Sequence, residues 1–521
     1  MPALRADHPA NPLRRRLLQA AVGVAGLAVS GGGARLLARP NFRDYPFTLG
    51  VASGEPSVDG FVLWTRFAPD PLHGGGMPEL DVAVEWQVAE DEAFGRVVRR
   101  GVAIASPQWA HSLHVEVEGL GADRWYFYRF LSAGAVSPTG RTRTLPAAGA
   151  AAARLRLAVA SCQHFEQGYF SAYRHMLDDD LDFIVHVGDY IYEGSWGAQL
   201  RLHETPRGAY TLDEYRNRHA CYKRDPDLAA AHAACPWLVT WDDHDVANDY
   251  AGLAPADDEP PAEFAARRAA AYRAYYEHMP LRSVHRPHAD GGLWLPTRLD
   301  FGALARINLV DDRQYRSPHP CAERGTTLRN CAQRFAADQS MLGSAQERWL
   351  HEGLSDSPGL WNVLAQQTLI APFESRADDG GYDVWTDGWD GYAGARARLL
   401  DGIAAAGTRN VIALGGDVHA FYVTDLKTDF GDERAPAIAT EFVGTSITSS
   451  DVDFAAVSRD LPHNPHVRYF ESRWRGYLRC EVTPQQWRTD LRIVDNVDNA
   501  TSRASTLASF HVEDGRPGAQ T

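Results

Sequence analysis

The chain has 521 residues, of which 45% are apolar and 23% are charged, a composition that excludes a disordered chain and a small disulfide-stapled scaffold. Its 67 acidic residues outnumber its 52 basic residues, and the formal net charge of −15 argues against a stable nucleic-acid partner or an anionic membrane surface. At roughly 150 residues per domain, this length predicts two or three domains.

The amino terminus has the features of an export signal. Residues 14–19 read R-R-R-L-L-Q and precede an interrupted apolar run from Ala20 to Ser30. A basic start, a short apolar run and small residues before a cleavage point are typical of a twin-arginine signal peptide, here residues 1–38. A membrane anchor fits less well, because the apolar run is shorter than the roughly 20 residues that cross a bilayer. We expect the twin-arginine machinery to export the chain to the periplasm or beyond, with no transmembrane segment after signal removal.

Residues 43–146 are predicted to form a small all-β domain. Short alternating apolar runs are separated by Gly, Pro and Asp, with no convincing helical stretch between them. This pattern is typical of an antiparallel sandwich of the fibronectin III or immunoglobulin type. Residues 147–153 consist only of Ala and Gly and are expected to be a linker.

Residues 154–495 change to the rhythm of an α/β domain, and residues 496–521 are expected to be a polar tail. Apolar runs alternate with helical patterns such as those at 262–278 and 344–354. The predicted buried strands are Leu155–Ala160, Phe183–Val187, Trp237–Val239, Ile307–Val310, Val363–Ala365 and Val411–Leu414.

Six cysteines in an exported chain are expected to include disulfides. The pairs Cys321/Cys331 and Cys221/Cys235 each enclose a short loop, so both are plausible bridges. Cys480 and Cys162 belong to neither pair. Cys162 comes two residues after the predicted strand Leu155–Ala160, with Ser161 between them.

Chemically active residues follow each of these apolar runs. Because loops at the carboxyl ends of strands share one rim of an open α/β sheet, we expect these clusters to meet and to make a polynuclear metal site. The clusters are Ser161–Gln163, Gly188–Glu193, Asp242–Asp245, Asp311–Arg313, Gln366–Thr368 and Gly415–His419.

The first two clusters offer ligands of different kinds. Asp189 can bridge two cations, and Tyr192, one helical turn later, is a strong ligand for a trivalent ion such as Fe(III). A metal would deprotonate the thiol of Cys162. Taken alone, Asp189 also fits a helix cap and Cys162 a buried unreactive cysteine.

The later clusters are acidic. Asp242, Asp243 and Asp245 surround His244, and in a buried site such charges repel one another unless cations are present. A solvated acidic loop is the alternative, which the apolar residues leading into it disfavour. Asp417 and His419, two residues apart, face one side of an extended segment.

In order and in residue type, these blocks resemble the calcineurin-like metallophosphoesterases, and specifically the PhoD-type alkaline phosphatases and phosphodiesterases. The phrases F-T-L-G-V-A-S-G-E-P at 47–56 and E-F-V-G-T-S at 441–446 are similar to that family too, and the resemblance runs from about residue 43 to 495. It implies a metallophosphoesterase β-sandwich flanked by helices, preceded by the all-β domain.

The resemblance also implies a metal set. Fe(III) is expected on Cys162, Asp189, Tyr192 and His419, with Asp189 bridging to one or more Ca(II) ions. Asp243 and Asp417 are expected to hold the Ca(II), and oxygen ligands at these positions favour it over Zn(II). The histidine that the wider superfamily supplies before the last block has no clear counterpart, and Gln367 is the candidate for its place.

Two functions follow from these expectations. The first is a secreted phosphoesterase acting on small-molecule or polymer phosphate esters, in which the metals generate hydroxide from bound water. His244 would stabilise the transition state or protonate the leaving oxygen. The second is a non-catalytic periplasmic or cell-surface binding protein that its metals stabilise. The insertions at 193–223 and 282–295 are candidates for the rim of a substrate pocket.

Overall fold

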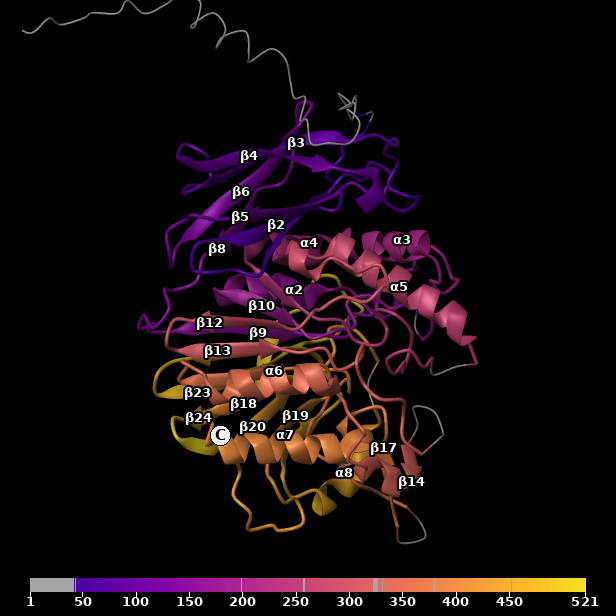
Figure 1. Ribbon diagram of the computed structural model, residues 1–521, viewed down its shortest axis with the longest axis vertical. Coiled ribbons are helices and arrows are strands. Elements are labelled where there is room, and N and C mark those ends of the chain that lie inside the picture. Colours follow the sequence, from indigo (N-terminus) through magenta and orange to yellow (C-terminus); the bar gives the residue numbers. More distant parts are fainter. Residues whose placement is uncertain are drawn as a thin grey trace, which may run out of the picture.

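The computed structural model describes residue 42 and residues 44–521, except 198, 256–257, 322–326, 330, 378–380 and 451. The predicted signal peptide lies outside the described residues. Figure 1 shows an elongated molecule with the N-terminal strands at one end, magenta helices below them, and orange and yellow elements at the other end. Within the described part, no helix combines the length and apolar character that a membrane span needs.

Two sheets form the centre of the molecule. The ten-stranded sheet has the order β25 (Arg516–Gln520), β24 (Ala504–Glu513), β23 (Gln486–Val494), β22 (Arg475–Val482), β9 (Leu155–Ala160), β10 (Phe183–His186), β11 (Trp237–Val239), β1 (Val51–Gly54), β2 (Phe61–Arg66) and β5 (Ser112–Val117). The seven-stranded sheet has the order β12 (Thr297–Phe301), β13 (Ala305–Leu309), β15 (Trp361–Ala365), β18 (Val411–Gly415), β20 (Ala439–Val443), β19 (Phe421–Leu426) and β21 (Val467–Glu471). Strands β9, β10 and β11 run parallel, as do β13, β15, β18 and β20.

The alternation of side chains explains why these strands are apolar throughout. In β9, Leu157 and Val159 pack between the two sheets, whereas Ala158 and Ala160 pack against the helices outside. In the same way, Ile412 of β18 points between the sheets and its neighbours point outward. Because both faces of each strand are covered, almost every position is apolar.

Helices cover the outer face of each sheet. The helices α6 and α7 cross the seven-stranded sheet in front of β18 and β20 (Figure 1), and α2 to α5 share a core with β9, β10 and β11. The predicted β-sandwich flanked by helices is therefore confirmed. The helices are α2 (Ser171–Met176), α3 (Leu212–Lys223), α4 (Pro226–Ala234), α5 (Pro261–His278), α6 (Gly343–Ser355), α7 (Ala393–Ala406) and α8 (Phe454–Asp460).

The N-terminal region is all-β, as predicted, but its strands are divided between two sheets. Strands β1, β2 and β5 extend the ten-stranded sheet, where Gly54 of β1 pairs with Trp237 of β11. They enclose an apolar core with a five-stranded sheet. This sheet contains β4 (Val97–Ala105), β3 (Val82–Ala89), β6 (Trp125–Ser132), β7 (Ala135–Val136) and β8 (Gly140–Arg143); a further small sheet contains β14 (Thr327–Arg329), β17 (Tyr382–Trp385) and β16 (Ser375–Arg376).

Two sequence-based expectations are wrong. The polar tail at 496–521 instead supplies β24 and β25, because β24 pairs along β23 and buries Phe510 and Val512 in the inter-sheet core. Cys321 and Cys331 form the expected disulfide, but Cys221 and Cys235 are free thiols. Their surroundings differ, since Cys221 lies beside Glu204 on the α3 side and Cys235 beside Arg141 and Asp182.

Candidate metal centre

The loops that follow β9, β10 and β11 of the ten-stranded sheet meet the loop that follows β18 of the seven-stranded sheet at one rim. The sequence predicts this meeting, but at the rim of a single sheet. The amide of Cys162 donates a hydrogen bond of 3.2 Å to the carbonyl of Gly188. A Cβ on Gly188 would lie 2.3 Å from the Cβ of Asp242, and one on Gly416 would lie 2.4 Å from the Ser161 hydroxyl oxygen. Only glycine permits these approaches, so the four loops pack together through positions that exclude side chains.

Four of the predicted ligands have left-handed backbone conformations. The φ angles are 58° at Cys162, 54° at Asp189, 63° at Asp417 and 51° at His419. Residues other than glycine adopt this region at a cost of order 1–3 kcal/mol each, and such strain concentrates at functional sites. The backbone therefore aims these side chains inward at the expense of stability.

The first group of candidate ligands contains Cys162, Asp189 and His419, whose ligand atoms lie within 4.8 Å of one another. The Tyr192 hydroxyl joins them, since it donates a hydrogen bond of 2.8 Å to Asp189 Oδ2 and lies 3.3 Å from His419 Nε2. The Ser449 hydroxyl donates to Tyr192 at 2.6 Å. The structure thus brings together all four residues expected to hold iron.

The imidazole of His419 is oriented for ligation. Its Nδ1 lies 2.8 Å from the carbonyl oxygen of Ser450, so Nδ1 carries the proton and Nε2 faces the other candidate ligands with its lone pair. Burial and the nearby Arg475 lower the pKa of His419 to about 3. The neutral imidazole is the form that binds a metal.

The second group contains Asp189, Asp242, Asp243 and Asp417, again with ligand atoms within 4.8 Å of one another. Asp189 belongs to both groups, which is the arrangement of a bridging carboxylate. Asp242 Oδ2, Asp243 Oδ1 and Asp417 Oδ2 are buried and accept no hydrogen bond from any described residue. Buried carboxylate oxygens are normally paired, so these orphaned atoms fit a site for cations.

The pKa values of groups at the rim also indicate that this site needs cations. Burial, with the charge of Asp243, raises the pKa of Asp417 to about 7. Burial and the carboxylates of Asp189 and Asp417 raise the pKa of the Cys162 thiol well above its usual value. These groups resist ionisation in the protein alone, so bound cations would supply the missing stabilisation.

His244 lies beside both groups. Its Nδ1 is 2.9 Å from Glu193 Oε2, and its ring stacks on that of Tyr192 with the centroids 4.3 Å apart. Burial lowers the pKa of His244, but the carboxylates of Asp243, Glu193 and Asp189 outweigh burial and raise it well above the usual value. The imidazole is therefore held in place by Glu193, and the surrounding carboxylates favour its protonated form.

A buried arginine inside the acidic cluster was not assigned a role from the sequence. Arg313 hydrogen bonds Asp242 through Nε and Asp387 through Nη1 at 2.7 Å, and its Nη2 lies 3.7 Å from Asp243 and 3.9 Å from Asp417. It neutralises part of the acidic charge and fixes the loop after β11. The run Asp311–Arg313 after a predicted strand was the signal for it, whereas Asp387 follows the short strand β17 of the three-stranded sheet, which gave no such signal.

Gln367 also lies at the rim. Its side-chain nitrogen donates to the carbonyl of Trp241 at 2.8 Å, and its backbone carbonyl accepts from Gly416 at 2.6 Å. Its Oε1 is buried with no hydrogen-bond partner among the residues described. A buried amide oxygen without a hydrogen-bond partner is suited to bind Ca(II). Gln367 was the candidate for the place of the superfamily's histidine, and it offers an oxygen donor where the histidine offers a nitrogen.

The comparisons with known proteins agree with this geometry. The family model for the PhoD-like phosphatase matches residues 157–491, and the model for the PhoD-like phosphatase N-terminal domain matches residues 33–146. Alkaline phosphatase D of Bacillus subtilis (strain 168) is 44% identical, over 97% of this chain and 88% of its own length. The solved structure described as "Structure of PhoD" matches with a TM-score of 0.89 at 44% identity and covers 92% of this chain and 93% of its own. The chain belongs to the PhoD-like phosphatase family.

Proposed function

We propose that the chain is a metal-dependent phosphoric ester hydrolase and that the rim of strand ends is its active site. The single observation that carries this proposal is the pair of ligand groups that share Asp189, built on a left-handed backbone in a chain of the PhoD-like phosphatase family. The name of the Bacillus relative, alkaline phosphatase D, supports the same reaction class. Nothing in the geometry favours a non-catalytic binding protein.

The donor atoms support the identity of the metals. Thiolate, phenolate, carboxylate and imidazole from Cys162, Tyr192, Asp189 and His419 suit Fe(III). The oxygen-only set of Asp189, Asp242, Asp243 and Asp417, with Gln367 as a further oxygen donor, suits Ca(II). When bound, such ions polarise the phosphoryl group and make water a competent nucleophile at moderate pH.

The protein groups around this centre have distinct tasks. Protonated His244, oriented by Glu193, lies close enough to the ligand groups to donate a proton to the departing ester oxygen. Trp196 packs 5.0 Å from the His244 ring and shields that side of it. Arg313 keeps Asp242 and Asp243 in place, so its removal should disturb metal binding before it disturbs proton transfer.

The location and the wider substrate range are also part of the proposal. The twin-arginine pattern at residues 14–19 supports export of the folded, metal-loaded protein to the periplasm or beyond. Cations at the rim would dominate the local field, so a chain with a net charge of −15 can still bind an anionic phosphate ester, free or part of a polymer.

Absorption and turnover measured on the same preparation test this proposal. Protein from a host that loads metals should release phosphate from a generic ester and absorb visible light, because phenolate and thiolate ligands give charge-transfer bands with Fe(III). Tyr192→Phe should shift or bleach that band, whereas Tyr45→Phe, at an exposed tyrosine in the N-terminal region, should not. Metal-replete protein without any hydrolysis would leave only the binding-protein alternative.

A chelator identifies the second metal. Removing Ca(II) should abolish hydrolysis, and Ca(II) should restore it better than Zn(II) or Mg(II), because oxygen-rich sites prefer the larger cation. Equal rescue by Zn(II) would contradict the assignment to calcium.

A further inference from the structure

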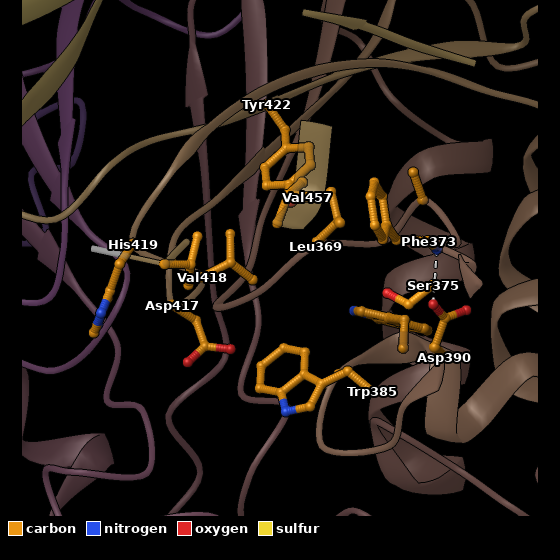
Figure 2. A pocket seen from close by; sticks show the side chains of 14 residues that line it. Leu369, Phe373, Ser375, Trp385, Asp390, Asp417, Val418, His419, Tyr422 and Val457 are labelled. Atoms are coloured by element: carbon orange, nitrogen blue, oxygen red, sulfur yellow. Dashed lines mark hydrogen bonds between the residues drawn. The ribbon is translucent and has the colours of Figure 1, made fainter. Parts of the chain in front are cut away.

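A cavity of about 390 Å³ opens directly beside the candidate metal centre. Its volume lies within the range of ligand pockets, about 300–1,000 Å³. Asp417 and His419 line one end, and Phe373 and Asp390 line the other (Figure 2). A molecule bound to the metal centre through its phosphate would therefore have space for its organic group on this side.

The walls between these ends are apolar. They come from the loop after β15, the end of β17 and the loop after it, the loop after β18, strand β19 and helix α8. They extend the apolar core under α6 and α7 to the surface. Figure 2 shows Trp385, Leu369 and Tyr422 between the metal-side residues and Phe373. The main apolar lining residues are Leu369, Phe373, Trp385, Trp389, Tyr422 and Val457.

Two polar side chains of the lining, Trp389 and Asp390, are already engaged by the protein. The Trp389 indole nitrogen donates to Gln366 at 3.0 Å. Asp390 Oδ2 accepts from the backbone amide of Phe373 at 2.8 Å, and Asp390 Oδ1 pairs with Arg396 at 2.6 Å. The far end of the cavity is thus electrically compensated, although it contains a carboxylate.

The charges that remain disfavour an anionic group. Among the described residues, the lining contains no lysine or arginine, and His419 is its only histidine. A second phosphate or a carboxylate would find no cation in the cavity. A quaternary ammonium group would find aromatic rings, but the acidic charge that would attract it is already paired with Arg396.

We propose that this cavity receives the organic group of the ester and makes the enzyme selective for apolar alkyl or aryl groups over charged or polyhydroxylated ones. The inference rests on the proposed metal centre, because Asp417 and His419 are shared by both sites. Trp385, partly exposed and positioned along the wall, is the principal specificity residue. Val457 contributes from helix α8 on another wall.

The test measures kcat/KM for methyl, butyl and hexyl phosphates and for their methyl diesters. Each additional buried methylene should raise kcat/KM by up to about fourfold, the equivalent of its transfer from water. The neutral 3,3-dimethylbutyl ester should be a better substrate than the choline ester, which has the same shape and a positive charge. Glycerol phosphate should be a poor substrate.

Three variants assign the selectivity to the cavity. Trp385→Ala should lower the hexyl-to-methyl ratio by about tenfold, as expected for a hydrophobic pocket that loses one wall, and Trp385→Phe should restore most of it. Val457→Asp should lower the same ratio by placing a charge in the cavity, which guards against a folding defect in Trp385→Ala. Trp349→Ala is the matched control, because Trp349 is also partly exposed but packs on Arg298 and Trp294 outside the cavity. It should leave the ratio unchanged.

The outcomes separate the two proposals. Absence of turnover on every ester by metal-replete protein would mean that the proposed function has failed. Turnover that is independent of chain length, a preference for choline over the dimethylbutyl ester, or full selectivity in both cavity variants would overturn the apolar pocket while leaving the hydrolase intact.

Discussion

Residues within a strand and residues just beyond its carboxyl end lie in opposite environments, one apolar and the other charged. Within β9, Leu157 and Val159 are buried between the sheets with apolar neighbours on all sides. Two residues beyond the strand, Cys162 has a left-handed backbone and a buried thiol beside carboxylates. The change from one environment to the other takes fewer than ten residues along the chain.

This contrast shows how the fold supports a charged site. The strand bodies supply free energy through apolar burial, at roughly 25 cal/mol per Å². The strand ends consume part of it through unpaired buried carboxylates and strained φ angles at Asp189, Asp417 and His419. Substitutions at the ends should therefore affect function, and substitutions in the bodies should affect stability.

The largest effect is expected at the bridging carboxylate. Asp189→Asn should lower turnover by at least about 10³-fold, the scale of losing a principal charge-stabilising group, and should release metal from both ligand groups. Asparagine tolerates the left-handed backbone, and the change removes a repulsive charge, so the metal-free protein should unfold at the same or a higher temperature. Elemental analysis and thermal unfolding measure the two parts. Retention of the full metal content would show that Asp189 is not a bridge.

A substitution within a strand should have the opposite effect, because it should lower stability and leave turnover unchanged. Leu157→Ala removes a fully buried side chain between the sheets and should cost about 2–5 kcal/mol of unfolding free energy. Turnover per metal-loaded molecule should not change, because the ligands lie beyond the strand. Urea unfolding measures the change in stability, and steady-state kinetics on the same preparation measure turnover. A loss of metal without a loss of stability would contradict the proposal that strand bodies determine stability and strand ends determine function.

His244 tests the chemistry at the strand ends. His244→Ala should retain both metals and lose about 10²-fold or more in turnover on alkyl esters, the usual scale of general-acid help. Nitrophenyl esters should lose less, because their leaving group departs without a proton. Metal loss would make His244 a ligand, and an equal loss on both ester classes would assign it to phosphoryl charge stabilisation.

The smallest expected effect concerns pH. The carboxylate of Glu193 helps to raise the pKa of His244, and a raised pKa keeps the imidazole protonated to higher pH. Glu193→Gln removes that charge, so the pH at which activity on alkyl esters falls on the alkaline side should move downward. Glu214→Gln, in the first turn of α3 where the side chain caps the helix, serves as a control. An unchanged alkaline limb would separate His244 from proton transfer.

Much of the fold was predictable because the central strands are continuous apolar runs followed by chemically active loops. The run Leu155–Ala160 has no alternation to mark one exposed face, and this is typical of a strand covered on both sides. The expected meeting of Asp189 and Asp243 followed from the rule that neighbouring parallel strands share a carboxyl edge, whereas Asp417 joins them from the loop after β18 of the other sheet.

The two wrong expectations, the polar tail and the Cys221/Cys235 bridge, and the missed role of Arg313 have physical causes. Strand β24 reads A-S-T-L-A-S-F-H-V-E, and with only Phe510 and Val512 buried it has too few apolar residues to be distinguished from a tail. The short spacing of Cys221 and Cys235 suggested a bridge, but α3 and α4 direct the two thiols toward different neighbours. The role of Arg313 depends on Asp387, a contact across 74 residues that no local pattern encodes.

Anomalous X-ray scattering at the iron absorption edge, from crystals of metal-loaded protein, tests the central claim most directly. We expect one strong iron peak enclosed by Cys162, Asp189, Tyr192 and His419, with separate non-iron density among Asp189, Asp243 and Asp417. An active, fully loaded enzyme whose iron peak lies elsewhere, or which has no iron peak, would contradict it.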